Sequence, residues 1–299
     1  LRAALGPRRV VLAVSYGAAL ASVALGALIG TLAIAGWSPA LAAWDVLRPA
    51  HAWINVFGFL SLVIAASLLH LLPTVAGTRI ERTPVSTLVL VGLMTGPLTV
   101  AIGFVMRVTP LVVAGAALVV LAALALVWHA AMVLRRRGRW TTDRPWHRFV
   151  QWSLLASVGW FAVGSALAAA VVIGSGAPAR GWDSAVVLGP LALGWAAQAL
   201  VGSWSHLVPA VGPGSPDVHA RQRAILGRWA TTRVVLAQVG VALVSVGVPT
   251  GDGRILQVGL ALVGGCAVVA VTLIAAALRP IVSLPSRGAA LDRSGTIPR

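Results

Sequence analysis

A short segment at the end of one apolar run recurs 136 residues further along the chain. The first copy is Ser67-Leu-Leu-His70-Leu-Leu-Pro73-Thr-Val75, and the second is Ser203-Trp-Ser-His206-Leu-Val-Pro209-Ala-Val211. At the same offset, Gly58 corresponds to Gly194 and Phe59 corresponds to Trp195. Both copies close a long apolar run. The pattern therefore predicts a duplicated membrane unit, with one histidine at the same depth in each half.

The composition sets the class of protein around this repeat. The chain has 299 residues, of which 59% are hydrophobic and only 10% charged, and its mean hydropathy is +0.92. A soluble protein of this length cannot bury so much apolar surface. A spanning helix needs about 20 apolar residues, and eight runs qualify. We therefore predict an all-α polytopic membrane protein with helices near 10–36, 50–75, 84–106, 111–134, 149–173, 184–208, 229–248 and 255–278.

The charged residues are mostly arginines, and they lie on one side of the predicted membrane. The segments on that side hold 19 of the 23 arginines, and the alternate segments hold only Arg48, Arg107, Arg180 and Arg254. Positive loops face the cytoplasm, so we expect both termini there and the protein in the cell membrane. The net charge of +16 then indicates contact with anionic lipid headgroups rather than with nucleic acid.

An even number of helices in each unit gives both copies the same orientation. We predict a first four-helix repeat over residues 1–140, a second over 141–279, and a disordered cytoplasmic tail or linker over 280–299. The two repeats should be related by a pseudo-twofold axis along the membrane normal. The chain begins with Leu1 rather than methionine, and we expect it to be a trimmed or excised part of a longer protein.

Few residue types inside the runs can carry chemistry. All seven acidic residues fall in predicted loops or in the tail, which argues against a proton-coupled transporter, because these need a buried carboxylate. Cys266 is the only cysteine, so neither a disulfide within the chain nor a thiolate metal cage is available. The polar residues Asn55, Gln198 and Gln238 are expected to form hydrogen bonds between helices. Trp160 and Trp195 are expected to pack in the core, and the alternative is that they flank a planar group.

Histidine is the remaining candidate. Neutral imidazole is the usual axial ligand of heme and a good ligand of copper. His70 and His206 are predicted to share one metal or heme between the halves, with His129 as a third metal ligand. Alternatively, these side chains contact headgroups, and helices 2 and 6 pack through Gly58, Gly194 and Gly202. His147 and His219 are expected in solvated loops.

His51 opens the second run on the outer side. It lies 19 residues before His70, about 28 Å along a helix, so these two histidines cannot share a metal. The stretch Leu47-Arg48-Pro49-Ala50-His51-Ala-Trp-Ile-Asn55-Val-Phe-Gly58-Phe resembles helix 2 of the heme-copper oxidase subunit I superfamily, which includes NnrS-like proteins. That resemblance implies four-helix arcs and a low-spin heme on His51.

The chain is also similar to the multi-helix membrane region of actinobacterial multicopper oxidase or copper nitrite reductase-like proteins. The start of helix 2 in those proteins is matched by His51, Asn55, Gly58 and Phe59. The end of a later helix is matched by residues 205–211. Trp53 replaces a second histidine, Gly189 stands where a copper ligand is expected, and helix 7 has no His-His pair. A complete oxidase centre is therefore not expected.

The resemblance implies a module associated with heme b or copper, part of an oxidoreductase, that supports electron transfer to a redox partner or a fused copper domain. The alternatives are a cofactor-free membrane anchor or assembly subunit and, less favoured, a small-solute transporter.

Overall fold

The computed structural model describes residues 2–80, 83–138, 145–176 and 185–282. Within them, eight helices are long and apolar enough to cross a membrane, and there is no strand. The first half contains α1 (Arg2–Ile34), the continuous α3–η1–α4 (Trp44–Trp53, Ile54–Ser61, Leu62–Val75), α5 (Pro84–Val105) and α6 (Thr109–Arg135). The second half contains α8 (Pro145–Ser175), α9–η2–α10 (Ala185–Val187, Leu188–Ala197, Gln198–Val211), α12 (Ala230–Thr250) and α13 (Gly253–Val282).

The all-α polytopic prediction is confirmed, with small differences at the helix ends. The second span begins at Trp44 rather than near residue 50, so Asp45 lies in the first turn of α3 and not in a loop. Its carboxylate accepts a hydrogen bond of 2.8 Å from Arg107. Both side chains are about half exposed, so this pair contributes little stability. The predicted tail over 280–299 lies almost wholly outside the described residues.

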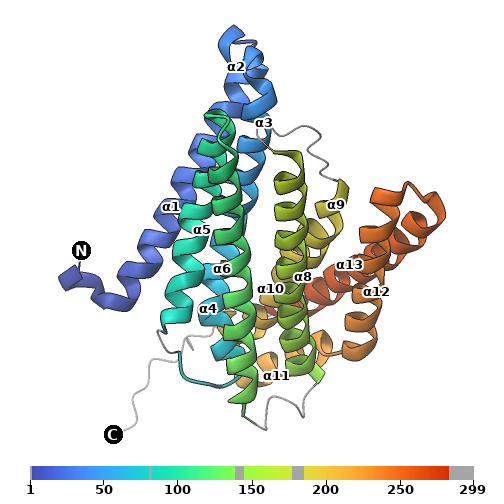
Figure 1. The fold of residues 1–299 in the computed structure, drawn as a ribbon. Helices are drawn as coiled ribbons and strands as arrows, with labels where there is room; N and C mark the ends of the chain where they lie inside the picture. The colour runs from blue at the N-terminus through green and yellow to red at the C-terminus, as the bar shows by residue number, and fades with distance from the viewer. Residues whose placement is uncertain (1, 81–82, 139–144, 177–184, 283–299) are drawn as a thin grey trace, which may run out of the picture.

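Two short helices outside the spans mark opposite ends of the bundle. The helix α2 (Ser38–Ala42) follows α1, and α11 (Pro216–Leu226) connects α10 to α12. Figure 1 shows α2 at the top of the bundle and α11 at the bottom. The sequence pattern did not predict α11. Its residues have low hydropathy, and the helix is capped at its N-terminus by Ser215, whose hydroxyl accepts from the Val218 amide.

The helices that carry the repeated histidines have matching bounds. The helices α4 and α10 each contain 14 residues, and both their first and last residues are 136 apart. Each follows a π-helical segment, η1 before α4 and η2 before α10. Such segments are rare and often occur at functional sites. His70 and His206 therefore occupy the same position in equivalent helices.

Glycine contacts extend this correspondence to the hairpins α5–α6 and α12–α13. A Cβ atom at Gly96 would lie 2.9 Å from the Gly115 carbonyl oxygen, and one at Gly240 would lie 3.1 Å from the Gly259 oxygen. These two pairs are 144 residues apart. Small residues let helix backbones approach closely in a membrane. The superposition of the halves by rotation about the membrane normal stays a prediction.

The first helices of the halves also correspond. Gly26 of α1 faces Asn55, and Gly164 of α8 faces Leu191, with a Cβ at either glycine less than 2.5 Å from that side chain. The equivalent positions of α1 and α8 are thus 138 residues apart, whereas Asn55 and Leu191 are 136 apart. No single sequence offset therefore relates all the matched positions of the two halves.

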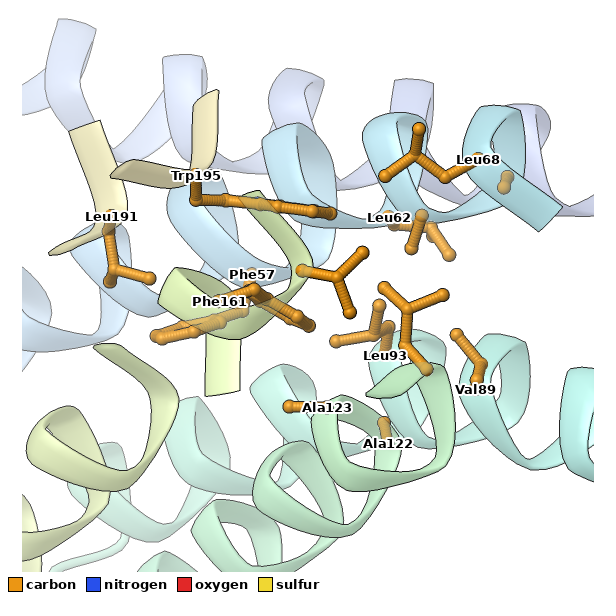
Figure 2. Close-up of a cluster of buried hydrophobic side chains, with 14 of the residues drawn as sticks. Phe57, Leu62, Leu68, Val89, Leu93, Ala122, Ala123, Phe161, Leu191 and Trp195 are labelled. Carbon is orange, nitrogen blue, oxygen red and sulfur yellow. The ribbon is translucent and has the colours of Figure 1, made fainter. Parts of the chain in front are cut away.

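Aromatic side chains join the two halves. Phe161 of α8 stacks on Trp195 of η2 with ring centroids 4.5 Å apart, and it lies 6.4 Å from the Phe57 ring of η1. The Trp195 indole donates a hydrogen bond of 3.1 Å to the Ser61 hydroxyl at the end of η1. Figure 2 shows Phe57, Phe161 and Trp195 grouped beside Leu62 and Leu191. The core is therefore continuous from one half to the other.

The arginine distribution makes a testable prediction of topology. In a Cys266→Ala background, Ser38→Cys at the start of α2 should react in intact cells with a membrane-impermeant thiol reagent. Ala220→Cys on α11 should react only after the membrane is opened. Both positions are exposed. Efficient labelling of Ala220→Cys in intact cells would show that the protein has the opposite orientation in the membrane.

Candidate functional site

His51 is held against α1 by its ring. Its Nδ1 lies 2.8 Å from the carbonyl oxygen of Gly26. Since a carbonyl only accepts, Nδ1 is the donor in this contact, and in the neutral ring the lone pair is then on Nε2. The Asn55 side-chain nitrogen lies 3.3 Å from the same Nδ1. The Asn55 amide donates to the His51 carbonyl at 2.8 Å. Gly30 leaves room for the ring, because a Cβ there would lie 3.2 Å from its Cε1.

His70 on α4 and His129 on α6 both lie toward the predicted cytoplasmic end of the first half. The Nδ1 of His70 lies 3.2 Å from the Ala66 carbonyl oxygen of its own helix. His129 on α6 is near enough to interact electrostatically with His70. It is buried, and its Nε2 has no hydrogen-bond partner among the described residues. Beside it, a cavity of about 120 Å³ is lined also by Arg79 and Arg136.

His206 lies in a different environment from that of His70. Its ring stacks on Trp146 of α8, with centroids 5.5 Å apart and planes 9° apart. Its Nδ1 is buried and has no hydrogen-bond partner in the described part of the chain. The Trp146 indole donates to the Ser205 carbonyl at 2.7 Å. His147, which we expected in a solvated loop, is instead buried in the first turn of α8 beside Trp146.

These positions bear on the predicted metal sites in different ways. Across the described residues, no group of three or more His, Cys, Asp or Glu side chains is placed to hold a metal ion. The structure places His129 within electrostatic range of His70, and it stacks Trp146 on His206. Ligation of one metal by His70 and His206 stays a prediction. The alternative included packing of helices 2 and 6 through Gly58, Gly194 and Gly202. That packing is not found, because these glycines face Ser22, Trp160 and Leu154 of α1 and α8.

A second polar group lies inside the second half. The Trp160 indole donates to the Gln238 side-chain oxygen at 2.7 Å, and the Gln238 amide donates to the Gln198 oxygen at 3.1 Å. The expected role of Gln198 and Gln238 in hydrogen bonds between helices is thus confirmed. Asn55 differs, because its amide bonds within its own helix.

Arg233 was missed as a candidate by the sequence reasoning, which assigned it to the cytoplasmic end of α12. Its side chain is buried, and one guanidinium nitrogen donates to the Leu226 carbonyl at 3.0 Å. The guanidinium carbon lies 3.7 Å from the centre of the Phe149 ring. The sequence did contain an indication of this role. Arg233 lies three residues inside an apolar span, where an ionisable residue is a functional candidate.

The fold and the apolar spans define an all-α, multi-pass membrane protein whose lipid-facing surface contacts a bilayer. Searches of protein families, of curated proteins and of solved structures found no match.

Proposed function

We propose that the chain is a heme-associated membrane module that supports electron transfer to a redox partner, with His51 as an axial ligand. The observation that carries the proposal is the 2.8 Å contact between the His51 Nδ1 and the Gly26 carbonyl oxygen. Histidines that ligate metals usually donate the other ring N–H to a carbonyl or carboxylate, which fixes the tautomer and the ring orientation. His51 has this arrangement, with Nε2 left for iron.

A comparison with the second half supports a specific role for His51 and Asn55. At the 136-residue offset, Val187 stands in place of His51 and Leu191 in place of Asn55. Leu191 packs against Gly164 as Asn55 packs against Gly26. An apolar side chain therefore satisfies the packing at this junction. A ligand role gives a reason for the imidazole and the amide that the first half has at these two positions.

Heme fits the described residues better than a copper site built from three protein ligands. Copper sites commonly need three or more imidazole or thiolate ligands, and no such group occurs among the described side chains. Heme needs one or two axial ligands from the protein. When bound, the iron would supply a reversible one-electron change. His51 would hold the heme through its imidazole, which is fixed against α1 by the Gly26 carbonyl oxygen. That hydrogen bond would raise the electron density on the imidazole.

His51 also indicates where the partner would dock. It lies in the last turn of α3, toward the end of the bundle that carries α2 in Figure 1. The arginine bias assigns that end to the outer side of the membrane. The redox partner, either a separate protein or a fused copper domain, is therefore expected on the outer surface.

The absorption spectrum of the detergent-purified protein tests the proposal. We expect a Soret band, shifted on reduction, and iron in roughly equal amount with protein. His51→Leu should abolish both, whereas His70→Leu and His206→Leu should retain them. Loss of heme in the latter two variants, with retention in His51→Leu, would instead support the shared site. Absence of iron and copper from the wild-type protein would contradict the proposal and favour the cofactor-free anchor.

A further inference from the structure

An open groove at the predicted cytoplasmic end of the second half is lined by two arginines that the heme proposal does not use. The groove lies between the start of α8 and α11, and its lining includes Pro145, Trp146, Arg223 and Arg228. Pro145 is the first residue of the α8 span, and Arg228 precedes the α12 span, which begins at Ala230, by two residues. The groove therefore lies where the bundle leaves the apolar core of the membrane.

One wall of the groove is a buried aromatic ring held from two directions. The Trp146 indole donates to the Ser205 carbonyl oxygen at 2.7 Å, and the ring stacks on His206. The guanidinium carbon of Arg223 lies 5.8 Å from the centre of this ring, which is within the range of a cation–π interaction. The ring thus positions the Arg223 guanidinium without neutralising its charge.

The second arginine projects from a junction between α11 and α12 that several contacts fix. The buried guanidinium of Arg233 donates to the Arg228 carbonyl oxygen at 3.4 Å. Gly227 lies against the start of α8, where a Cβ atom would be 2.7 Å from the Trp146 nitrogen. Trp229 follows in a left-handed conformation with φ 51°, which is uncommon for a bulky residue. The backbone at Arg228 is therefore held in place while its side chain is exposed.

Neither arginine of the groove has an acidic partner in the described part of the chain. Arg223 and Arg228 form no ion pair with a carboxylate of residues 2–80, 83–138, 145–176 or 185–282. The acidic residue of α11, Asp217, lies six residues before Arg223, about 9 Å along a helix. Arg221 adds a further positive charge to the same helix. The groove therefore presents positive charge that is available to an anion.

The groove belongs to a segment that distinguishes the second half from the first. The helix α11 lies in the connection between α10 and α12. The described residues of the corresponding connection between α4 and α5, which are 76–80 and 83, contain no helix. The first half thus turns from one span into the next without such an element. A binding role gives a reason for an added helix that carries unpaired arginines beside the membrane.

We propose that this groove binds the phosphate group of an anionic phospholipid. Guanidinium groups bind phosphate oxygens through charged hydrogen bonds, and basic pockets between spanning helices on the cytoplasmic side recognise anionic headgroups. Tryptophan is enriched at the level of the headgroups, and Trp229 and Trp204, at the start of α12 and toward the end of α10, are 64% and 52% exposed. This location favours a lipid over a soluble phosphate ester.

The first test measures binding of tritiated dioleoylphosphatidylglycerol to the detergent-purified full chain. We expect saturable binding that is displaced by unlabelled phosphatidylglycerol and not by phosphatidylcholine, whose headgroup has no net charge. Equal displacement by millimolar glycerol 3-phosphate would assign the groove to a soluble phosphate ester and overturn the lipid as its source. Absence of saturable binding would overturn the proposal and favour an acidic protein segment as the occupant. This readout does not depend on heme, so it is independent of the proposed function.

Variants that remove the same charge from different positions locate the site. Arg223→Gln and Arg228→Gln should each weaken phosphatidylglycerol binding about tenfold, the loss of roughly one hydrogen bond to a charged group. Arg221→Gln is the matched control, because it removes an exposed arginine of α11 that does not line the groove, and it should leave binding unchanged. An equal loss in all three variants would indicate general attraction of lipid to a positive surface and would contradict a site in the groove.

A third variant tests the groove without changing its charge. Ala224 is exposed and lines the groove, so Ala224→Phe should obstruct the headgroup and weaken binding about tenfold or more. Arg228→Gln keeps the test valid if Arg223→Gln destabilises α11, because the Arg228 side chain forms no hydrogen bond with the described residues. Unchanged binding in a folded Arg228→Gln or Ala224→Phe protein would contradict the assignment.

Discussion

Gly115→Leu is expected to prevent the close packing of α5 on α6. A Cβ atom at Gly115 would lie 2.6 Å from both the Gly96 carbonyl oxygen and the Val100 nitrogen. These are backbone atoms of the facing helix, so no rotamer change relieves the contact. Overpacking with movable side chains already costs about 1–3 kcal/mol. We therefore expect the free energy of unfolding to fall by about 3 kcal/mol or more. A larger fall would prevent recovery of the protein as a monodisperse species.

The measurement is thermal unfolding in detergent, followed by fluorescence-detected size-exclusion chromatography. Gly259→Leu is the equivalent change in α12–α13, where a Cβ would lie 2.8 Å from the Val244 nitrogen, and it should behave similarly. Gly159→Leu is the matched control, because no atom lies within 4 Å of a Cβ at this position of α8. A Gly115→Leu protein as stable as Gly159→Leu would show that the hairpin is not as close as described.

The spans could be predicted because apolar run length is a direct consequence of bilayer thickness. The repeat was predicted from the residues around His70 and His206, where the offset of 136 is unbroken. The similarity of the hairpins α5–α6 and α12–α13 was not recognised in the sequence, because their offset is 144 rather than 136. The offset is larger because the segment between α10 and α12 contains the additional helix α11. The two π-helical segments were also missed. A single extra residue in a helix leaves the apolar pattern of a fully hydrophobic run unchanged.

The candidate site was less accessible to sequence reasoning than the fold. His51 was a candidate from the sequence, but the Gly26 carbonyl that orients its ring comes from another helix and is seen only in the fold. Residue type and helix position placed His70 and His206 together, yet one lies near His129 and the other stacks on Trp146. These differences arise from neighbours on α6 and α8, which are distant in sequence. For the same reason, the burial of Arg233 depends on Phe149 of another helix.

Trp195→Ala is expected to weaken the connection between the halves. The indole is completely buried, stacks on Phe161 and donates to the Ser61 hydroxyl of the first half. Truncating a buried tryptophan to alanine typically costs about 3–5 kcal/mol, because packing is lost and a cavity remains. Within a membrane, van der Waals packing and hydrogen bonds are the main sources of helix association. Both are removed here.

Smaller changes at the same place separate these two contributions. Trp195→Phe copies Phe59 of the first half and keeps an aromatic ring against Phe161, so we expect a loss of about 1 kcal/mol from the hydrogen bond. Ser61→Ala should cost a similar amount in the wild-type background and much less when added to Trp195→Phe, because both remove one interaction. Trp204→Ala, at a tryptophan that is 52% exposed, should be close to neutral. Denaturant unfolding in mixed micelles gives the values for all five variants, Trp195→Ala included. Equal effects of Trp195→Ala and Trp204→Ala would mean that contacts of α6 with α8 hold the halves together without the aromatic cluster.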